Sequence, residues 1–272
     1  MGVALLSLAL IHGSCASAHA LPRGPASDVH GDDENDVYVG TGGLLLPSSV
    51  GSSTRAEVAT CGGCTWRLTS PCIEPALGNP FDGQSACMSV VRGCPAGQRL
   101  LRAWFRPADQ AWRESGLVCI GEGGPVTVEQ IGRQARDRFV QGVPEPVVRY
   151  QPPAGMVTQL PVVFDSGQPA GTLTRSYRVM GEEVWLTASA RWQWDFGDGS
   201  SLDTSDPGGP YPHQGVAHAY RTAGNRTVVL RTIWSASYTV DGLGPFPVPE
   251  EIGQVSRLRI DVGEGRAVLT PG

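Results

Sequence analysis

The stretch RWQWDFGDGSSLDTSD, residues 191–206, decides the fold. Three aromatic residues alternate with polar ones and lead into Gly197-Asp198-Gly199. Because successive side chains of a strand point to opposite faces, Trp192, Trp194 and Phe196 share one face. A stripe of this kind is typical of a sandwich core, and the two glycines favour a tight turn. The stretch therefore predicts a buried strand that ends in a turn.

The same period of two continues on both sides of this stretch, over residues 160–265. Short strand-like runs separated by turn residues predict an antiparallel β-sandwich. Tyr220, in HAYRTAGNRTVVL, precedes a glycine turn and a β-branched strand, a placement that suits the anchoring of a sandwich corner. The expected strands are RSYRVMG, EEVWLTASA, RWQWDFG, NRTVVLRTIWSASYTV and VSRLRIDV.

The pattern WDFGDG followed by HAYRTAGNRTVVL resembles the polycystic kidney disease (PKD) repeat, an immunoglobulin-like module of extracellular proteins. The loop SSLDTSDPGGPYPHQGVA is longer than is usual in that family, and Arg226-Thr227 stands where an aromatic residue is frequent. The resemblance implies extracellular recognition of protein or glycan, or a spacer role. The residues that match the family pattern are Trp194, Asp195, Phe196, Gly197, Asp198, Gly199, His218, Tyr220 and Gly224.

The N-terminal twenty residues contain an apolar run, GVALLSLALI, that is too short to span a bilayer. Small residues follow, and they predict a signal peptide, residues 1–20, cleaved near Ala18 or Ala20. Residues 21–57 are acidic and then rich in Gly and Ser, which predicts a disordered leader. We therefore expect a secreted or cell-envelope protein.

Six cysteines remain after that cleavage, and all lie between residues 61 and 119. In an exported chain, an even number predicts up to three structural disulfides, with the pairing left open. Cys61 and Cys64 form a Cys-x-x-Cys pair, so a redox or metal-dependent site remains an alternative. The cysteines are Cys61, Cys64, Cys72, Cys87, Cys94 and Cys119.

A helix is predicted over residues 126–142, because Thr127 and Gln130 can form a capping box before an apolar stripe. We assign residues 58–142 to a small disulfide-rich α+β module that ends with this helix. The Pro-rich residues 143–159 are then expected to form a linker. The expected architecture is thus mainly β, with two modules.

The whole chain also resembles exported actinobacterial proteins that pair a cysteine-containing part with one PKD-like domain. The segments CPAGQRLLRAWF and QPPAGMVTQLPVVFDSGQP carry this likeness. All 21 basic residues are Arg, which fits a genome rich in G and C. The likeness implies export and two modules, and no known activity.

Few residues suggest chemistry beyond recognition. A net charge of −5 without a basic run argues against nucleic acid, and no second apolar stretch could span a membrane. No nucleophile–base motif is present, so we expect no enzyme and no cofactor. A calcium site is a weaker hypothesis, formed by Asp195, Asp198, Asp203 and Asp206. The expected function is recognition of an extracellular protein or glycan, with a purely structural envelope component as an alternative.

Overall fold

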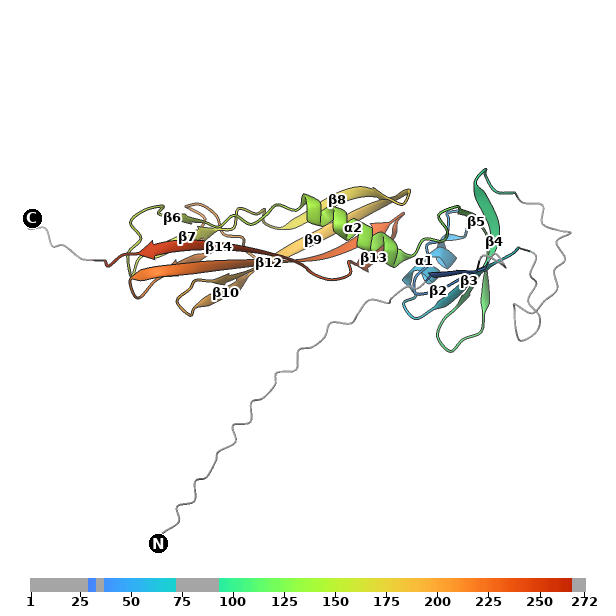
Figure 1. Ribbon diagram of the computed structural model, residues 1–272, viewed down its shortest axis with the longest axis horizontal. Helices are drawn as coiled ribbons and strands as arrows, with labels where there is room; N and C mark the ends of the chain where they lie inside the picture. The colour runs from blue at the N-terminus through green and yellow to red at the C-terminus, as the bar shows by residue number, and fades with distance from the viewer. Residues whose placement is uncertain (1–28, 33–36, 72–92, 266–272) are drawn as a thin grey trace, which may run out of the picture.

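The computed structural model describes residues 29–32, 37–71 and 93–265 (Figure 1). An N-terminal module precedes a longer C-terminal domain. The N-terminal module contains β1 (Val29–Asp32), β2 (Val37–Thr41), α1 (Ser52–Thr60), β3 (Thr65–Thr69), β4 (Gln98–Arg106) and β5 (Arg113–Gly121). The C-terminal domain contains α2 (Val128–Gly142), β6 (Arg149–Gln151), β7 (Pro161–Asp165), β8 (Thr172–Val179), β9 (Glu182–Asp195), β10 (Ser201–Thr204), β11 (Ala217–Ala219), β12 (Gly224–Val240), β13 (Leu243–Pro247) and β14 (Ile252–Val262).

The N-terminal module is one antiparallel sheet in the order β1-β2-β3-β4-β5, with α1 against it. Its core holds Trp66, Leu68 and Phe105 from the strands. Leu44 and Leu46, in the segment expected to be a disordered leader, are also buried in this core. The leader prediction is therefore wrong for residues 37–57, because its apolar residues complete the core despite the surrounding Gly and Ser.

The C-terminal domain is built on a long antiparallel sheet. Its strand order is β10-β9-β12-β13, with β8 also paired to β9 and β14 also paired to β12. A second sheet, β11-β7-β6, packs on the inner face near β10 and β14 (Figure 1). The two sheets bury the predicted aromatic stripe, since Trp192, Trp194 and Phe196 are at most 3% exposed. The predicted mainly β architecture with an immunoglobulin-like sandwich is confirmed.

Helix α2 has the predicted capping box between Thr127 and Gln130. Its apolar face, however, packs mainly on β8, β9 and β12 of the long sheet, and only Leu45 and Ala59 of the N-terminal module join the same buried cluster. Phe139 of the helix meets Trp234 of β12 edge to face, with ring centroids 5.9 Å apart. The expected boundary at residue 142 therefore divides one core, because the helix covers the half of the sheet that the second sheet leaves bare.

The segment expected to be a linker, residues 143–159, also belongs to the C-terminal domain. Val148 and Met156 are buried in its core, and β6 pairs with β7. A buried amide network ties this segment to the long sheet. Gln168 donates to the carbonyl of Pro144 at 2.7 Å, and its Oε1 accepts from the indole of Trp192 at 2.9 Å.

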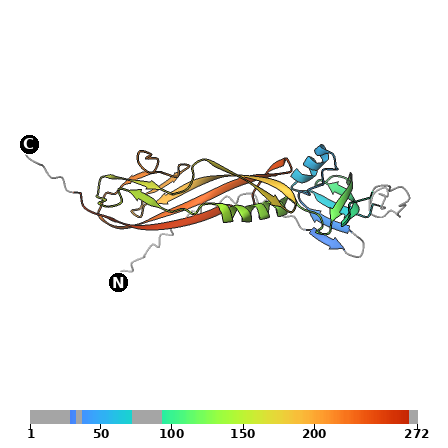
Figure 2. The same ribbon diagram turned by 90° about the horizontal axis from the view of Figure 1, so that it is seen from above.

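Two of the expected strands, EEVWLTASA and RWQWDFG, form the single strand β9. No Gly or Pro interrupts the chain between them, and β9 pairs with β12 without a break from Asp195/Val229 to Val184/Val240. The long strands β9 and β12 extend the sandwich into an elongated domain. The N-terminal module lies beyond one end of that domain (Figures 1 and 2).

The two modules contact each other through specific bonds. Arg55 of α1, which is buried, donates to the carbonyl of Leu46 at 2.9 Å and to the carboxylate of Asp241 in the β12–β13 turn. The backbone N–H of Leu45 donates to the carbonyl of Val126, just before α2, at 2.9 Å. Charged and backbone contacts therefore fix the module on the end of the long sheet.

Candidate functional site

The turn after β9 is held by its own aspartates. The carboxylate of Asp195 accepts from the backbone N–H of Gly197 at 2.9 Å. Gly197 has a φ of +78°, and a Cβ placed there would lie 2.6 Å from the carbonyl oxygen of Thr227. Glycine is therefore required at this position both by backbone conformation and by the close approach of β12.

A polar and aromatic cluster links this turn to β11. The Nε2 atom of His218 lies 2.8 Å from a carboxylate oxygen of Asp198, and its ring stacks on Phe196 with centroids 4.3 Å apart. Tyr220 meets the His218 ring edge to face at 4.6 Å, and its hydroxyl donates to the carbonyl of Phe196 at 3.1 Å. This bond joins Tyr220 to the end of β9 and is the kind of contact that a corner-anchoring tyrosine makes.

Asp198 is the most strongly perturbed carboxyl of the cluster. Partial burial raises its pKa, but hydrogen bonds from Ser200 and His218 outweigh burial and lower the pKa to about 2. Burial raises the pKa of Tyr220, so its hydroxyl stays protonated. The ionised carboxylate of Asp198 therefore holds the turn and His218 together. We call the arrangement of Asp198, Ser200 and His218 the clasp.

Ser200, His218 and Asp198 are the residue types of a hydrolytic triad, but their geometry is different. Ser200 Oγ lies 3.3 Å from Nε2 of His218, the same ring nitrogen that faces Asp198. A triad needs the serine and the carboxylate on different ring nitrogens, so that the base can receive the serine proton. The Ser200 hydroxyl also bonds to Asp198 itself. This arrangement clasps a turn and does not activate a nucleophile.

The four calcium candidates are held apart by other partners. Asp203 of β10 pairs with Arg191 at 2.8 Å, and Asp206 accepts from the N–H of Gly208 at 2.9 Å. Asp195 and Asp198 are used by the turn, as described above. Within the part of the chain that the structure describes, no three His, Cys, Asp or Glu side chains gather as metal ligands do.

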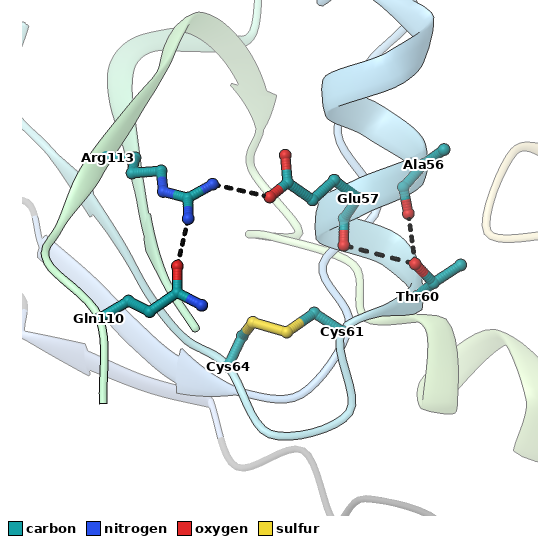
Figure 3. Close-up of a disulfide and its surroundings, with 7 residues drawn as sticks. All are labelled: Ala56, Glu57, Thr60, Cys61, Cys64, Gln110 and Arg113. Atoms are coloured by element: carbon teal, nitrogen blue, oxygen red, sulfur yellow. Dashed lines mark hydrogen bonds and ion pairs between the residues drawn. A yellow bond between two sulfur atoms is a disulfide. The ribbon is translucent and has the colours of Figure 1, made fainter. Parts of the chain in front are cut away.

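Cys61 and Cys64 form a disulfide at the end of α1 (Figure 3). Cys61 caps the C-terminus of that helix, and Cys64 is 1% exposed. Redox-active pairs depend on a helix N-terminus, whose positive end stabilises the thiolate. Here the helix presents its negative end. The surroundings of the bridge are the ion pair between Arg113 and Glu57, at 3.0 Å, and Gln110 (Figure 3).

A second disulfide joins Cys94 to Cys119 of β5. It ties the segment before β4 to the neighbouring strand. Cys72 and Cys87 lie outside the described residues, as do the predicted signal peptide and its cleavage positions near Ala18 and Ala20. No helix among the described residues is long and apolar enough to span a membrane.

These features define the class of the C-terminal domain. Two antiparallel sheets, an aromatic core strand and a tyrosine-anchored corner make an immunoglobulin-like sandwich. Residues 156–235 match the family model of the PKD domain, so the C-terminal half contains a PKD domain. No curated protein matches the chain. Helix α2, the end of β12, β13 and β14 lie outside the matched residues.

Three features of the structure were not predicted from the sequence. Arg55 and Asp241 are 186 residues apart, and no local pattern signals their pairing. Gln168 lies in an ordinary turn sequence, although its amide organises a buried network. Trp185 is 49% exposed on β9, and the alternation of EEVWLTASA could have placed it on the face opposite the core.

Proposed function

We propose that the protein is exported and non-catalytic, and that it recognises an extracellular partner with its elongated C-terminal domain as a rigid support. The observation that carries the proposal is the PKD domain itself, a module of extracellular recognition and spacing. Its sandwich is packed end to end with a module whose described residues include two disulfides. Disulfides persist in oxidising compartments, which is consistent with an extracellular site of action.

The contacts between the two modules favour one rigid body over two domains joined by a flexible tether. Tyr238 of β12 donates to the carbonyl of Val128 in α2 at 2.6 Å, which joins the helix to the end of the long sheet. Arg55 and Asp241 then join that end to α1. A rigid body presents its loops and faces in a fixed geometry, which reduces the entropic cost of binding.

The redox alternative is less well supported than recognition. The partly exposed cysteine of the bridge, Cys61, lies at a helix C-terminus, where a thiolate is not stabilised. Recognition needs no activated group, and the sandwich provides exposed strands and loops for it.

Export and disulfide formation are tested together. The full-length gene is expressed in a bacterium with a functional secretion system, and the mature protein is recovered from outside the cytoplasm. Intact mass is measured with and without reduction before alkylation. We expect cleavage near Ala18 or Ala20, no alkylation before reduction, and no bound metal. Retention in the cytoplasm, free thiols at Cys61 and Cys64, or a bound zinc ion would contradict the proposal.

A further inference from the structure

The outer face of the long sheet carries an uncharged field of hydroxyl groups. Residues that lie opposite each other on paired strands point to the same side of the sheet. Three such rows of opposite residues cross β8, β9 and β12. The rows are Ser176–Trp185–Thr239, Thr174–Thr187–Ser237 and Thr172–Ser189–Ser235. We call these nine residues the hydroxyl face. Eight carry a hydroxyl and the ninth is Trp185.

This face is turned away from the core. The residues that alternate with it on β9, Val184, Leu186 and Ala188, are at most 1% exposed and face α2. Trp185 is 49% exposed, so its large indole ring is open to a ligand on this side of the sheet. Among the described residues, no hydrogen bond joins the eight hydroxyls to another side chain, so each can donate and accept outward.

The charges around the hydroxyl face define what it can bind. Arg178 and Glu183 form the next row at one end, and Arg191 lies in the next row at the other end. The three rows between them contain no charge. An acidic polymer would find cations only at the margins of the face, where Arg175 donates to the carbonyl of Thr174 at the β8 edge. A protein partner would find one aromatic ring without an apolar surround. An uncharged ligand rich in hydroxyl groups matches the face both in its lack of charge and in its hydrogen-bonding groups.

We propose that the hydroxyl face binds a neutral β-1,4-linked polysaccharide, with Trp185 as the platform for one sugar ring. Such a polymer is a flat ribbon, whose apolar ring faces can pack on the indole and whose edge hydroxyls can bond to Ser and Thr. Strands lie about 4.8 Å apart and every second residue repeats at about 6.7 Å, so the rows present a regular grid. This inference rests on the proposed recognition function and names its ligand class.

The test uses the purified mature protein and three insoluble or soluble probes. These are cellulose and chitin, which are neutral, and polygalacturonate, which is acidic. Depletion from solution measures the dissociation constant for each. We expect binding to a neutral β-1,4-linked polymer, and Trp185→Ala should weaken it by about tenfold, the loss of one aromatic packing contact. Trp185→Phe should retain most of the affinity.

Two further variants control for folding and location. Tyr211→Ala removes another exposed aromatic, 71% exposed in the loop between β10 and β11, and should leave binding unchanged. Thr187→Glu places a charge in the centre of the hydroxyl face and should abolish binding with the melting temperature retained. Binding to neither neutral polymer, binding to polygalacturonate alone, or equal affinities for wild type and Trp185→Ala would overturn the proposal. These outcomes are independent of export, which the mass measurement tests.

Discussion

The hydroxyl of Tyr238 donates to the carbonyl oxygen of Val128 across a distance of 2.6 Å, and so joins β12 to the first turn of α2. The same tyrosine ring lies over Gly132, one turn further along the helix. A Cβ at residue 132 would be 2.8 Å from the hydroxyl oxygen of Tyr238. Close approach of the helix and the sheet therefore depends on a glycine.

Gly132→Ala should destabilise the C-terminal domain. The added methyl forces Tyr238 or the helix to move, and overpacking of this kind costs about 1–3 kcal/mol. Urea unfolding followed by tryptophan fluorescence measures the change. Gly142→Ala is the matched control in the same helix, because nothing lies within 4 Å of its Cβ position. Alanine is the better helix former, so that variant should be neutral or stabilised. Equal effects of the two substitutions would contradict the packing argument.

Asp241→Asn should weaken the attachment of the N-terminal module. It removes the charge that pairs with Arg55, whose side chain is 11% exposed, and Asn tolerates the φ of 47° at this turn. Because Asp241 is 46% exposed, we expect a loss of about 1 kcal/mol in unfolding free energy, smaller in high salt. Urea unfolding at low and high salt tests this.

The control for the interdomain pair is Glu57→Gln. Its partner, Arg113, is 51% exposed and Glu57 is 52% exposed, so the pair is well screened by solvent. We expect a change within about 0.5 kcal/mol. If Asp241→Asn is as mild as this control at low salt, the Arg55–Asp241 pair does not stabilise the interface.

The sequence predicts those parts of the fold that depend on local periodicity. Alternation alone places Trp192 and Trp194 in the core, and the capping pair Thr127 and Gln130 marks the start of α2. An amphipathic helix shows that it packs, but not against which surface, so the partner of α2 was misassigned to the cysteine-rich module. Long-range pairing of the kind that joins Arg55 to Asp241 leaves no local trace.

Composition was a poor guide in the segment before α1. Gly and Ser dominate residues 47–53, and they predict disorder. Leu44 and Leu46 nevertheless fill the N-terminal core, because a short apolar segment is enough to complete a small sheet. For the candidate site, the sequence predicted a tight turn at Gly197-Asp198-Gly199, and in the structure the carboxylates of Asp195 and Asp198 accept from the backbone of that turn. The hydroxyl face required the register of three strands, which the sequence does not specify.

The clasp at Asp198 should make folding depend on acid pH. Its pKa is lowered from the ordinary value of 3.8 to about 2 in the folded state. The unfolded chain therefore takes up the proton first as pH falls below about 4, and the stabilisation is lost as pH decreases towards 2. We expect Asp198→Asn to be less stable than wild type at neutral pH and to converge with it near pH 2. Thermal melting across this range measures the difference. The control is Glu145→Gln, which changes an exposed carboxyl and should show the same change of melting temperature with pH as wild type. A difference in melting temperature between Asp198→Asn and wild type that stays constant across this pH range would contradict the clasp.

The two disulfides among the described residues should contribute unequally to stability. Cys94 and Cys119 are 25 residues apart, whereas Cys61 and Cys64 are 3 apart. A longer closed loop restricts the unfolded chain more, so the first bridge should contribute about 3.5 kcal/mol and the second about 2 kcal/mol. Urea unfolding of the Cys94→Ser/Cys119→Ser and Cys61→Ser/Cys64→Ser double variants compares them under identical conditions. If the Cys61–Cys64 variant is the less stable, that bridge does more than close a loop. The CGGC turn, whose Cys64 carbonyl accepts from the N–H of Gly42 at 2.9 Å, would then be required to hold β2 in place.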